Sequence, residues 1–185
     1  MVIDPPAVLR TRNGMAPARI LPPLRSGRGR GTIYDQPDTP QAAFSWLGAD
    51  PPVGLGDTIE IIWYGPAGSW SAMPRFTGRV VEIQAREDLW QVQAYEITCS
   101  GRMLDLALAH VTLTRPAETD LARVAAISAA AGIPVTVVGT TSTMLVPDDI
   151  DRDALSALHE IAVSSAAIIR EDPDGATRSG APDHR

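Results

Sequence analysis

The sequence lacks lysine, has a single cysteine and has no long apolar run. All 16 basic residues are arginine, which together with the many alanines is typical of a GC-rich genome and does not bear on mechanism. The single cysteine, Cys99, excludes an internal disulfide and any zinc site built from several cysteines. Because Cys99 falls within a strand pattern, we expect it to be a small buried apolar residue.

No apolar run approaches the length of about 18 residues that a membrane-spanning helix needs, so we expect no insertion into a membrane. Asp4, Pro5 and Pro6 stand where a signal peptide would have a basic and then an apolar segment. The sequence therefore predicts no export signal. At 185 residues the chain is long enough to bury a core, as one domain or as two small ones.

Catalytic and metal-binding patterns are also missing. The three histidines, His110, His159 and His184, are far apart and have no ligand spacing. No serine or cysteine has the glycine-flanked context of a nucleophile, and the carboxylates are scattered through turns and helix ends. We therefore predict no catalytic residue, no cofactor and no metal site, and we do not expect an enzyme.

One acidic pattern resembles a calcium-binding loop. Asp149, Asp151, Asp153 and Glu160 match the first, third, fifth and twelfth positions of that loop. However, the sixth position is Ala154 where the loop needs glycine, its last positions overlap a predicted helix, and no helix precedes it. We interpret these residues as acids that cap and stabilise the start of a helix.

Positive charge is concentrated near the N-terminus. The net charge is −6, yet residues 1–30 contain six arginines against the single acid Asp4. Nine of the 16 prolines lie within residues 1–52, so we expect short strands there and no long helix. We predict that residues 1–30 form a basic arm rich in proline, glycine and arginine, which can bind nucleic acid or an acidic protein surface.

The glycine-rich segment at residues 26–31 is not a phosphate-binding loop, because no apolar strand precedes it and no helix follows. We interpret it as a turn before an edge strand, or as an arm that grips a neighbour.

Strand patterns dominate the middle of the chain. Ile59, Ile61 and Trp63 alternate with polar residues, which predicts a strand over residues 57–64. Further strands are predicted at residues 19–21, 32–34, 42–47, 75–83 and 90–99. Within the last of these the apolar positions change phase, so we predict a bulge or barrel corner near Ala94 and Tyr95.

Helical periodicity begins after this strand-rich half. Residues 116–131 and 152–164 are predicted helices, with Gly132 just past the end of the first and an aspartate capping the second. Residues 103–110 form a short helix or turn, and residues 111–114, 135–138 and 166–170 are strands. A hairpin turn at residues 171–175 leads into a strand that begins at residues 176–178.

The four tryptophans, Trp46, Trp63, Trp70 and Trp90, all belong to the strand-rich half. Core packing or subunit contact explains them better than base stacking does, since basic residues do not alternate with them.

The order of several short segments resembles one known family. These segments are GRGR at residues 27–30, YDQPD at 34–38, GLGDTIEI at 54–61, PRFTGRVVEI at 74–83, YEITCSGRMLDLA at 95–107, AAGI at 130–133, DALSALHEIA at 153–162 and DPDG at 172–175. Together they are similar to the minor tail proteins that form the baseplate hub of long-tailed bacteriophages. The resemblance covers about residues 18–176.

The resemblance implies an α+β protein with no reaction to perform. It implies a hub-type β-barrel over residues 31–115, a small α/β domain with two helices over residues 116–172, and a polar tail over residues 173–185. Hub proteins normally continue past the Asp-Gly turn to complete a second barrel, whereas this chain ends at Arg185. We expect either a short version whose partner strands come from another chain or a fragment.

The resemblance also implies partners and a location. Copies of the chain would form a ring, usually a trimer, beneath the tail tube, in contact with a distal tail protein and other tail-tip proteins. The location would be the virion tail tip, after synthesis in the host cytoplasm without a signal peptide. Arginines that line the lumen would contact passing DNA, although none is assigned to that wall.

Two other functions stay open. The first is a nucleic-acid-binding barrel of the oligonucleotide-binding type that uses residues 10–30 as a basic arm. Salt-sensitive binding to single-stranded DNA would distinguish it, because phosphate contacts release counterions. The second is an enzyme or an enzyme accessory domain, for which no catalytic residue is nominated.

Overall fold

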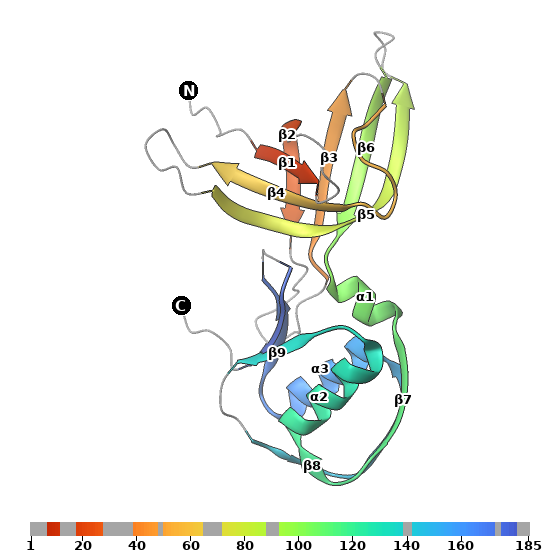
Figure 1. The fold of residues 1–185 in the computed structure, drawn as a ribbon, viewed down its shortest axis with the longest axis vertical. Helices are drawn as coiled ribbons and strands as arrows, with labels where there is room; N and C mark the ends of the chain where they lie inside the picture. Colours follow the sequence, from red (N-terminus) through yellow and green to blue (C-terminus); the bar gives the residue numbers. More distant parts are fainter. Residues whose placement is uncertain are drawn as a thin grey trace. The chain divides into compact units, whose positions relative to one another are not determined.

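The computed structural model describes residues 7–11, 18–27, 39–47, 50–64, 72–87, 93–138, 142–172 and 175–180. By its contacts the chain divides into two compact units. Unit 1 comprises residues 1–28, 40–101 and 173–175, and unit 2 comprises residues 29–39, 102–172 and 176–185. The expected α+β class is confirmed, because unit 1 is built from strands and unit 2 combines helices with strands (Figure 1).

The described residues of unit 1 form six antiparallel strands. These are β1 (Ala7–Thr11), β2 (Ala18–Gly27), β3 (Gln41–Leu47), β4 (Thr58–Tyr64), β5 (Ala72–Glu87) and β6 (Gln93–Ser100). They pair in the order β1-β2-β3-β6-β5-β4, and β1 pairs with β4 as well. The strand order therefore closes on itself, and each strand has a partner along both edges.

The core of unit 1 confirms the predicted alternation. Ile59 and Ile61 of β4 are fully buried, as are Ile97 and Cys99 of β6. This core also includes Ala42, Phe44, Val53, Phe76, Val80 and Tyr95. The period-two pattern places the strand residues among them on one face of the sheet, where they and Val53 exclude water from one another.

The bulge predicted near Ala94 and Tyr95 is wrong. The pairing of β6 with β3 and with β5 runs through both residues without a shift. The irregularity lies on the neighbouring strand instead, where Val81 is the extra residue between the positions paired with Cys99 and Thr98. The supposed phase change depended on residues 90 and 92, which lie outside the described residues.

Prolines account for two other irregularities. The register of β2 against β3 shifts between Leu21 and Arg25, across the two prolines at residues 22 and 23. The register of β4 against β5 shifts at Ile62, which stands opposite Pro74. Proline has no backbone N–H to donate, so a ladder that includes it must bulge or break.

Gly78 permits a close approach of strands. A Cβ atom at this position would overlap the backbone oxygen of Ser100 and the ring of Phe76. Only a residue without a side chain fits there, which explains the glycine within the predicted strand.

In the part of unit 2 that the structure describes there are three helices and seven short strands. These are α1 (Met103–Leu108), β7 (His110–Arg115), β8 (Glu118–Thr119), α2 (Asp120–Ala131), β9 (Val135–Val138), β10 (Met144–Leu145), β11 (Asp148–Asp153), α3 (Ala154–Ser164), β12 (Ile168–Glu171) and β13 (Thr177–Gly180). The strands form the pairs β7-β11 and β8-β10 and a three-stranded sheet in the order β12-β13-β9.

Specific caps set the ends of the helices. The Thr119 side chain accepts a hydrogen bond from the Ala122 amide, so α2 begins at Asp120 and not at residue 116. Gly132 ends α2 in the left-handed conformation (φ 68°), as predicted. Asp153 accepts from the Ser156 amide at 2.8 Å and caps α3, as the sequence led us to expect.

The core of unit 2 lies between the helices and the strands. Its buried members include Leu106 of α1, Val124 and Ile127 of α2, and Leu158 of α3. The strands contribute Val111, Ile150 and Ile169. The three-and-four spacing predicted for α2 and α3 therefore marks the faces that pack inward.

The structure draws the domain boundaries differently from the sequence. Residues 1–30, which we expected to form an arm, contribute strands β1 and β2. An extended segment needs only partners for its backbone groups, and β4 supplies them to β1 as β3 does to β2. Residues 102–115 belong to unit 2, since β7 pairs with β11. Within the expected C-terminal tail, β13 pairs with β12 and β9, so the returning strand is confirmed.

Candidate functional site

The acidic residues of the calcium-loop pattern lie on β11 and at the start of α3. Asp149 is exposed, Asp151 accepts hydrogen bonds from Thr112 and His110, and Asp153 caps α3. Within the described ranges, no group of three or more histidine, cysteine or carboxylate side chains converges as a metal site would require. Unlike a loop, β11 is a strand, and its backbone is paired with β7 along its whole length.

The described histidines and the cysteine lie in separate surroundings. His110 contacts Asp151 on the exposed side of unit 2, His159 lies half-buried on α3, and His184 is outside the described residues. Cys99 is a buried free cysteine, as predicted, and its burial raises the pKa of its thiol to about 12. At neutral pH this thiol stays protonated and is a poor nucleophile.

Two strand pairs of unit 2 form one interrupted ribbon. Strand β7 leads into β8, and β10 leads into β11, so the pairs β7-β11 and β8-β10 follow one another along the same two segments. The interruption lies between them, with Pro116 on one segment and Pro147 on the other. Because neither proline can donate a backbone hydrogen bond, the ladder breaks on both sides at once.

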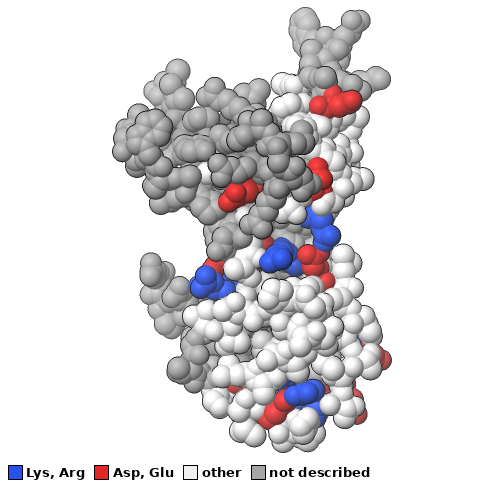
Figure 2. Space-filling view, viewed as in Figure 1, with Lys and Arg blue, Asp and Glu red and all other residues white. Residues whose placement is uncertain are grey.

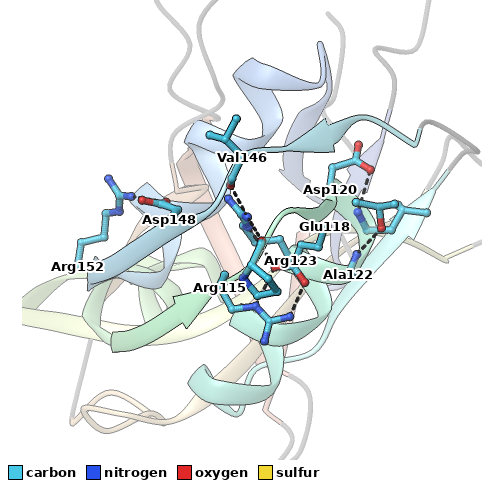
Figure 3. A network of polar contacts seen from close by, with 11 residues as sticks. Arg115, Glu118, Asp120, Ala122, Arg123, Val146, Asp148 and Arg152 are labelled. Atoms are coloured by element: carbon cyan, nitrogen blue, oxygen red, sulfur yellow. Dashed lines mark hydrogen bonds and ion pairs between the residues drawn. The ribbon is translucent and has the colours of Figure 1, made fainter.

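Arg123 of α2 bridges this interruption. Its Nη2 donates hydrogen bonds to the backbone oxygens of Val146, at 2.7 Å, and of Pro116, at 2.9 Å, so one guanidinium joins the two segments (Figure 3). The side chain of Arg123 is 5% exposed. A buried guanidinium presents donors in a fixed fork, which suits it to two carbonyls that lack strand partners.

Glu118 balances the charge of the buried arginine. Its Oε1 accepts hydrogen bonds from Nε of Arg123, at 3.2 Å, and of Arg115, at 2.8 Å, and a second contact joins Arg115 to Oε2. The hydrogen bonds and positive charge of Arg115, together with those of Arg123, hold the pKa of Glu118 below its usual value, although desolvation opposes the shift. The network stays charged at neutral pH.

The same helix start is also tied to β10. The Asp120 carboxylate accepts from the Thr143 amide at 3.2 Å, and the Asp120 amide donates to the Thr143 oxygen at 2.9 Å. Asp120 is 3% exposed. The residues before Met144 are therefore held to α2 on one side, while Arg123 holds those after Leu145.

Glu171 supplies a second buried carboxylate. Its Oε2 accepts from the backbone amide of Met103 at 2.8 Å, at the start of α1. Like the Arg123 network, this contact uses a charged side chain to satisfy a backbone group at the end of an element.

Two sets among the exposed large apolar side chains lie next to backbone that is held by hydrogen bonds. In unit 1, Leu55 is 70% exposed and Val81 is 40% exposed, and we call this pair the apolar knob. In unit 2, Met144 is 66% exposed and Val146 is 76% exposed, and with the exposed Pro147 they form what we call the apolar ridge. Exposed apolar groups on held backbone are typical of interaction surfaces.

The outer face of α2 carries no charge. Its exposed residues are all alanine, at positions 122, 125, 129 and 130, whereas its two charged residues, Asp120 and Arg123, point inward. In Figure 2 the middle of the visible face of unit 2 is free of charged side chains, which gather at its upper and lower ends. Surface helices normally carry their charges outward, so this face is unusual for one that meets only water.

Sequence reasoning missed the network and both exposed sets. A signal for the network was present, because Asp120 and Arg123 share the helix face of Val124 and Ile127. No local sequence signal predicts that Leu55 is exposed, since its exposure depends on a turn that is hydrogen-bonded to β5. As for the membrane, no helix among the described residues is long and apolar enough to cross one.

Solved structures of tail proteins share this fold. A tail protein from Neisseria meningitidis is similar over 98% of this chain and 52% of that chain, with a TM-score of 0.73 and 16% identity. The 43 kDa tail protein of prophage MuSo2 from Shewanella oneidensis is similar over 94% of this chain and 52% of that one, with a TM-score of 0.71 and 12% identity.

A third similar structure comes from a secretion system. It is an Escherichia coli component of the type VI secretion system, itself described as structurally similar to the T4 tail proteins gp27 and gp5. The likeness covers 93% of this chain and 48% of that chain, with a TM-score of 0.62 and 10% identity. No protein-family model and no curated protein sequence matches the chain.

This chain spans about half the length of these solved structures. At such low identities the likeness establishes the fold. The resemblance to phage tail proteins seen in the sequence is thereby confirmed at the level of the fold.

Proposed function

We propose that the protein is a structural component of a phage tail tip, a baseplate hub or minor tail protein that joins the tail tube to the distal tip assembly. The observation that carries this proposal is the fold shared with tail proteins over almost the whole chain. The order of the sequence segments that resemble hub proteins is a second, separate observation in support of the proposal.

In this proposal the closed strand order of unit 1 is the hub-type barrel, and unit 2 is the small α/β domain. A closed order leaves no open sheet edge, which suits a rigid wall. Copies of the chain form a ring, expected to be a trimer, against the tail tube, the distal tail protein and other tail-tip proteins. Contact with passing DNA belongs to the same proposal, and the protein performs no reaction.

Labelling of purified particles tests this role. Antibodies raised against the chain, with a bound electron-dense marker, are added to tailed particles produced by the genome that encodes it. We expect the marker at the end of the tail away from the head, in every intact particle. Particles that are complete and infectious without the protein would contradict the proposal.

A nucleic-acid-binding role predicts a different result. A basic surface built from residues 10–30 would bind single-stranded DNA with an affinity that falls steeply as salt is raised. We expect the isolated chain to show no such binding. Tight, salt-sensitive binding would favour the nucleic-acid-binding alternative over the tail component.

A further inference from the structure

We infer that the outer edge of β9 binds an extended peptide segment of another protein, which adds to the three-stranded sheet of unit 2 as a fourth strand. The added strand carries apolar side chains toward α2 and acidic side chains on its other face. The inference concerns this sheet alone and does not depend on a place in a phage tail. It goes beyond the proposed function, which assigns no surface to a partner.

Strand β9 has one unpaired edge. The sheet order is β12-β13-β9, and among the described residues only β13 pairs with β9. The Val135 amide donates to Oγ of Ser128, on α2, at 3.1 Å, so it faces away from β13. Successive residues of a strand direct their backbone groups to opposite edges, so Thr136 and Val138 direct theirs to β13. The amide and carbonyl of Val137 therefore face the open side, where a further strand can pair with them.

The sequence of β9 lacks the features that protect sheet edges. Its four residues are valine or threonine, which favour strands, and none is charged, proline or glycine. In contrast, five of the six residues of β11 are charged, and the closed strand order of unit 1 leaves no edge there. An edge without such protection is a template for a strand from another chain.

The open edge selects an extended peptide. Exposed apolar side chains, such as those of the apolar knob and the apolar ridge, fit many partners, whereas an amide and a carbonyl on a strand edge fit the backbone of another strand. A nucleic acid would bring phosphate oxygens to the Val137 carbonyl, and both groups are acceptors. A strand presents a donor and an acceptor together, so it satisfies both groups of Val137.

The side of the added strand that faces α2 should be apolar. Leu121, Ala125 and Ser128 follow one another on one face of α2, because they are four and three residues apart. Ser128 contacts the open edge at Val135, so Leu121 and Ala125 continue along that edge. Leu121 is half-buried and Ala125 is exposed. Neither carries a charge, so apolar side chains on alternate positions of the added strand match them.

The other face of the sheet attracts acidic side chains. Arg170 of β12 stands directly opposite Arg178 of β13, and Arg178 stands beside Thr136 of β9. Among the described residues one carboxylate, that of Asp172, contacts both guanidiniums. Two positive charges thus share one negative charge. The added strand would lie about 10 Å from β13, a distance that a glutamate and an arginine can bridge between them.

A peptide titration followed by NMR tests this site. The probe is a synthetic peptide of about six residues, the usual length of a strand, in which valine alternates with glutamate. It is added to the isotope-labelled full-length chain. We expect the Val137 amide signal to shift and its hydrogen exchange to slow by about tenfold, because the amide gains an acceptor. A matched peptide that alternates valine with arginine should bind about threefold more weakly.

Two results of this titration would overturn the inference. The first is an unchanged Val137 signal at millimolar peptide. The second is slow exchange of the Val137 amide in the free chain, since the edge would then already be covered.

A variant of the edge separates strand addition from binding elsewhere. Val137→Pro removes the outward donor but leaves the pairing of β9 with β13, so it should fold and bind the acidic peptide about tenfold more weakly. Val137→Thr keeps the amide and should bind as the parent chain does. Equal binding by the two folded variants would contradict the inference.

A charge variant tests the acidic preference without touching the edge. Arg178→Gln should weaken binding of the acidic peptide by about threefold. The matched control is Arg86→Gln, which changes an ion-paired arginine of unit 1 and should have no effect. Equal effects of the two variants would contradict the acidic preference, and this comparison remains valid if Val137→Pro fails to fold.

Sedimentation distinguishes a foreign segment from a second copy. A dimer of the parent chain that Val137→Pro abolishes would overturn the inference in favour of pairing between two β9 edges, and we expect no such dimer. These measurements use the isolated chain, so their outcome is separate from that of the proposed function. A chain that binds the peptide but is absent from tails loses only the tail role, and a chain that is present in tails but does not bind loses only this site.

Discussion

The two units satisfy their backbone polar groups by different means. In unit 1 the strand order closes on itself, and the described buried polar residues are the uncharged Thr77 and Ser100. In unit 2 the sheets are short, and Asp120, Arg123 and Glu171 are buried with hydrogen bonds to backbone groups. Where strand pairing is continuous, backbone groups bond to one another and no buried charged side chain is needed. Where the pairing is broken, charged side chains supply the missing hydrogen bonds to the backbone.

The two units also differ in how they accommodate prolines in their strands. In unit 1 the prolines at residues 22, 23 and 74 coincide with shifts in register, and pairing resumes beyond them. In unit 2 Pro116 and Pro147 interrupt both segments of a ribbon, and a side chain from α2 spans the gap. The stability of unit 2 should therefore depend on a few ionic residues, and that of unit 1 on close packing of strands.

Replacement of Arg123 should have the largest effect. Arg123→Ala leaves the backbone oxygens of Pro116 and Val146 without their donor and Glu118 with one cation fewer, so we expect unit 2 to lose about 3–5 kcal/mol. Hydrogen exchange under native conditions should show faster exchange at Ile127 and unchanged exchange at Ile97 of unit 1. Arg115→Ala is the control, since Arg115 is more exposed, and it should cost less.

In unit 1, by contrast, the addition of one methyl group at Gly78 should lower the free energy of unfolding. Gly78→Ala forces a Cβ against the Ser100 backbone oxygen, which cannot move aside as a side-chain end would. We expect a loss of about 1–3 kcal/mol in urea denaturation, confined to unit 1. Gly132→Ala in unit 2 meets no atom and should cost only about 1 kcal/mol, from its positive φ. A reversed order of these two losses would refute the packing argument.

Low pH should destabilise unit 2 through Glu118, and this effect is expected to be smaller than the two above. The pKa of Glu118 is lowered in the folded chain, so its ionised form stabilises unit 2 above its unfolded pKa of about 4.3, and this contribution is lost as the pH falls through its lower folded pKa. Urea denaturation from pH 7 to pH 3 should show unit 2 losing stability over that range. Glu118→Gln should be less stable at pH 7 and should show a flatter pH dependence. An unchanged slope would mean that other carboxylates, such as Asp151 and Asp153, carry the effect.

A smaller loss is expected from the cap of α2. Thr119→Ala removes the acceptor for the Ala122 amide and should cost about 1 kcal/mol. Thr119→Ser keeps the hydroxyl and serves as the matched control. If both variants lose the same stability in urea denaturation, the methyl group of Thr119 matters and the cap does not.

The smallest predicted effect is a gain. Ala166 has a positive φ of 52° just past α3, where glycine is the favoured residue. Ala166→Gly should stabilise unit 2 by up to about 1 kcal/mol, because relief of the strained backbone outweighs the extra freedom of the unfolded chain. A loss of thermal stability instead would show that Ala166 is not strained.

Local patterns predicted the elements well, and contacts distant in sequence explain what they missed. The alternation of Ile59 and Ile61 identified β4, and Gly132 marked the end of α2, because those signals lie within a few residues. Strand β1 was not predicted, and only residues 19–21 of β2 were, since the partners of both strands are supplied by β3 and β4. The role of Arg123 depends on Val146, which is 23 residues away.

The most direct test of the account is a reconstruction of the native tailed particle by electron cryomicroscopy, at a resolution that traces strands. We predict a ring of copies around the tail axis at the end of the tube, with the closed strands of unit 1 forming part of its wall. Density in which this chain is absent from the tail, or stands there as a single copy off the axis, would contradict the central claim.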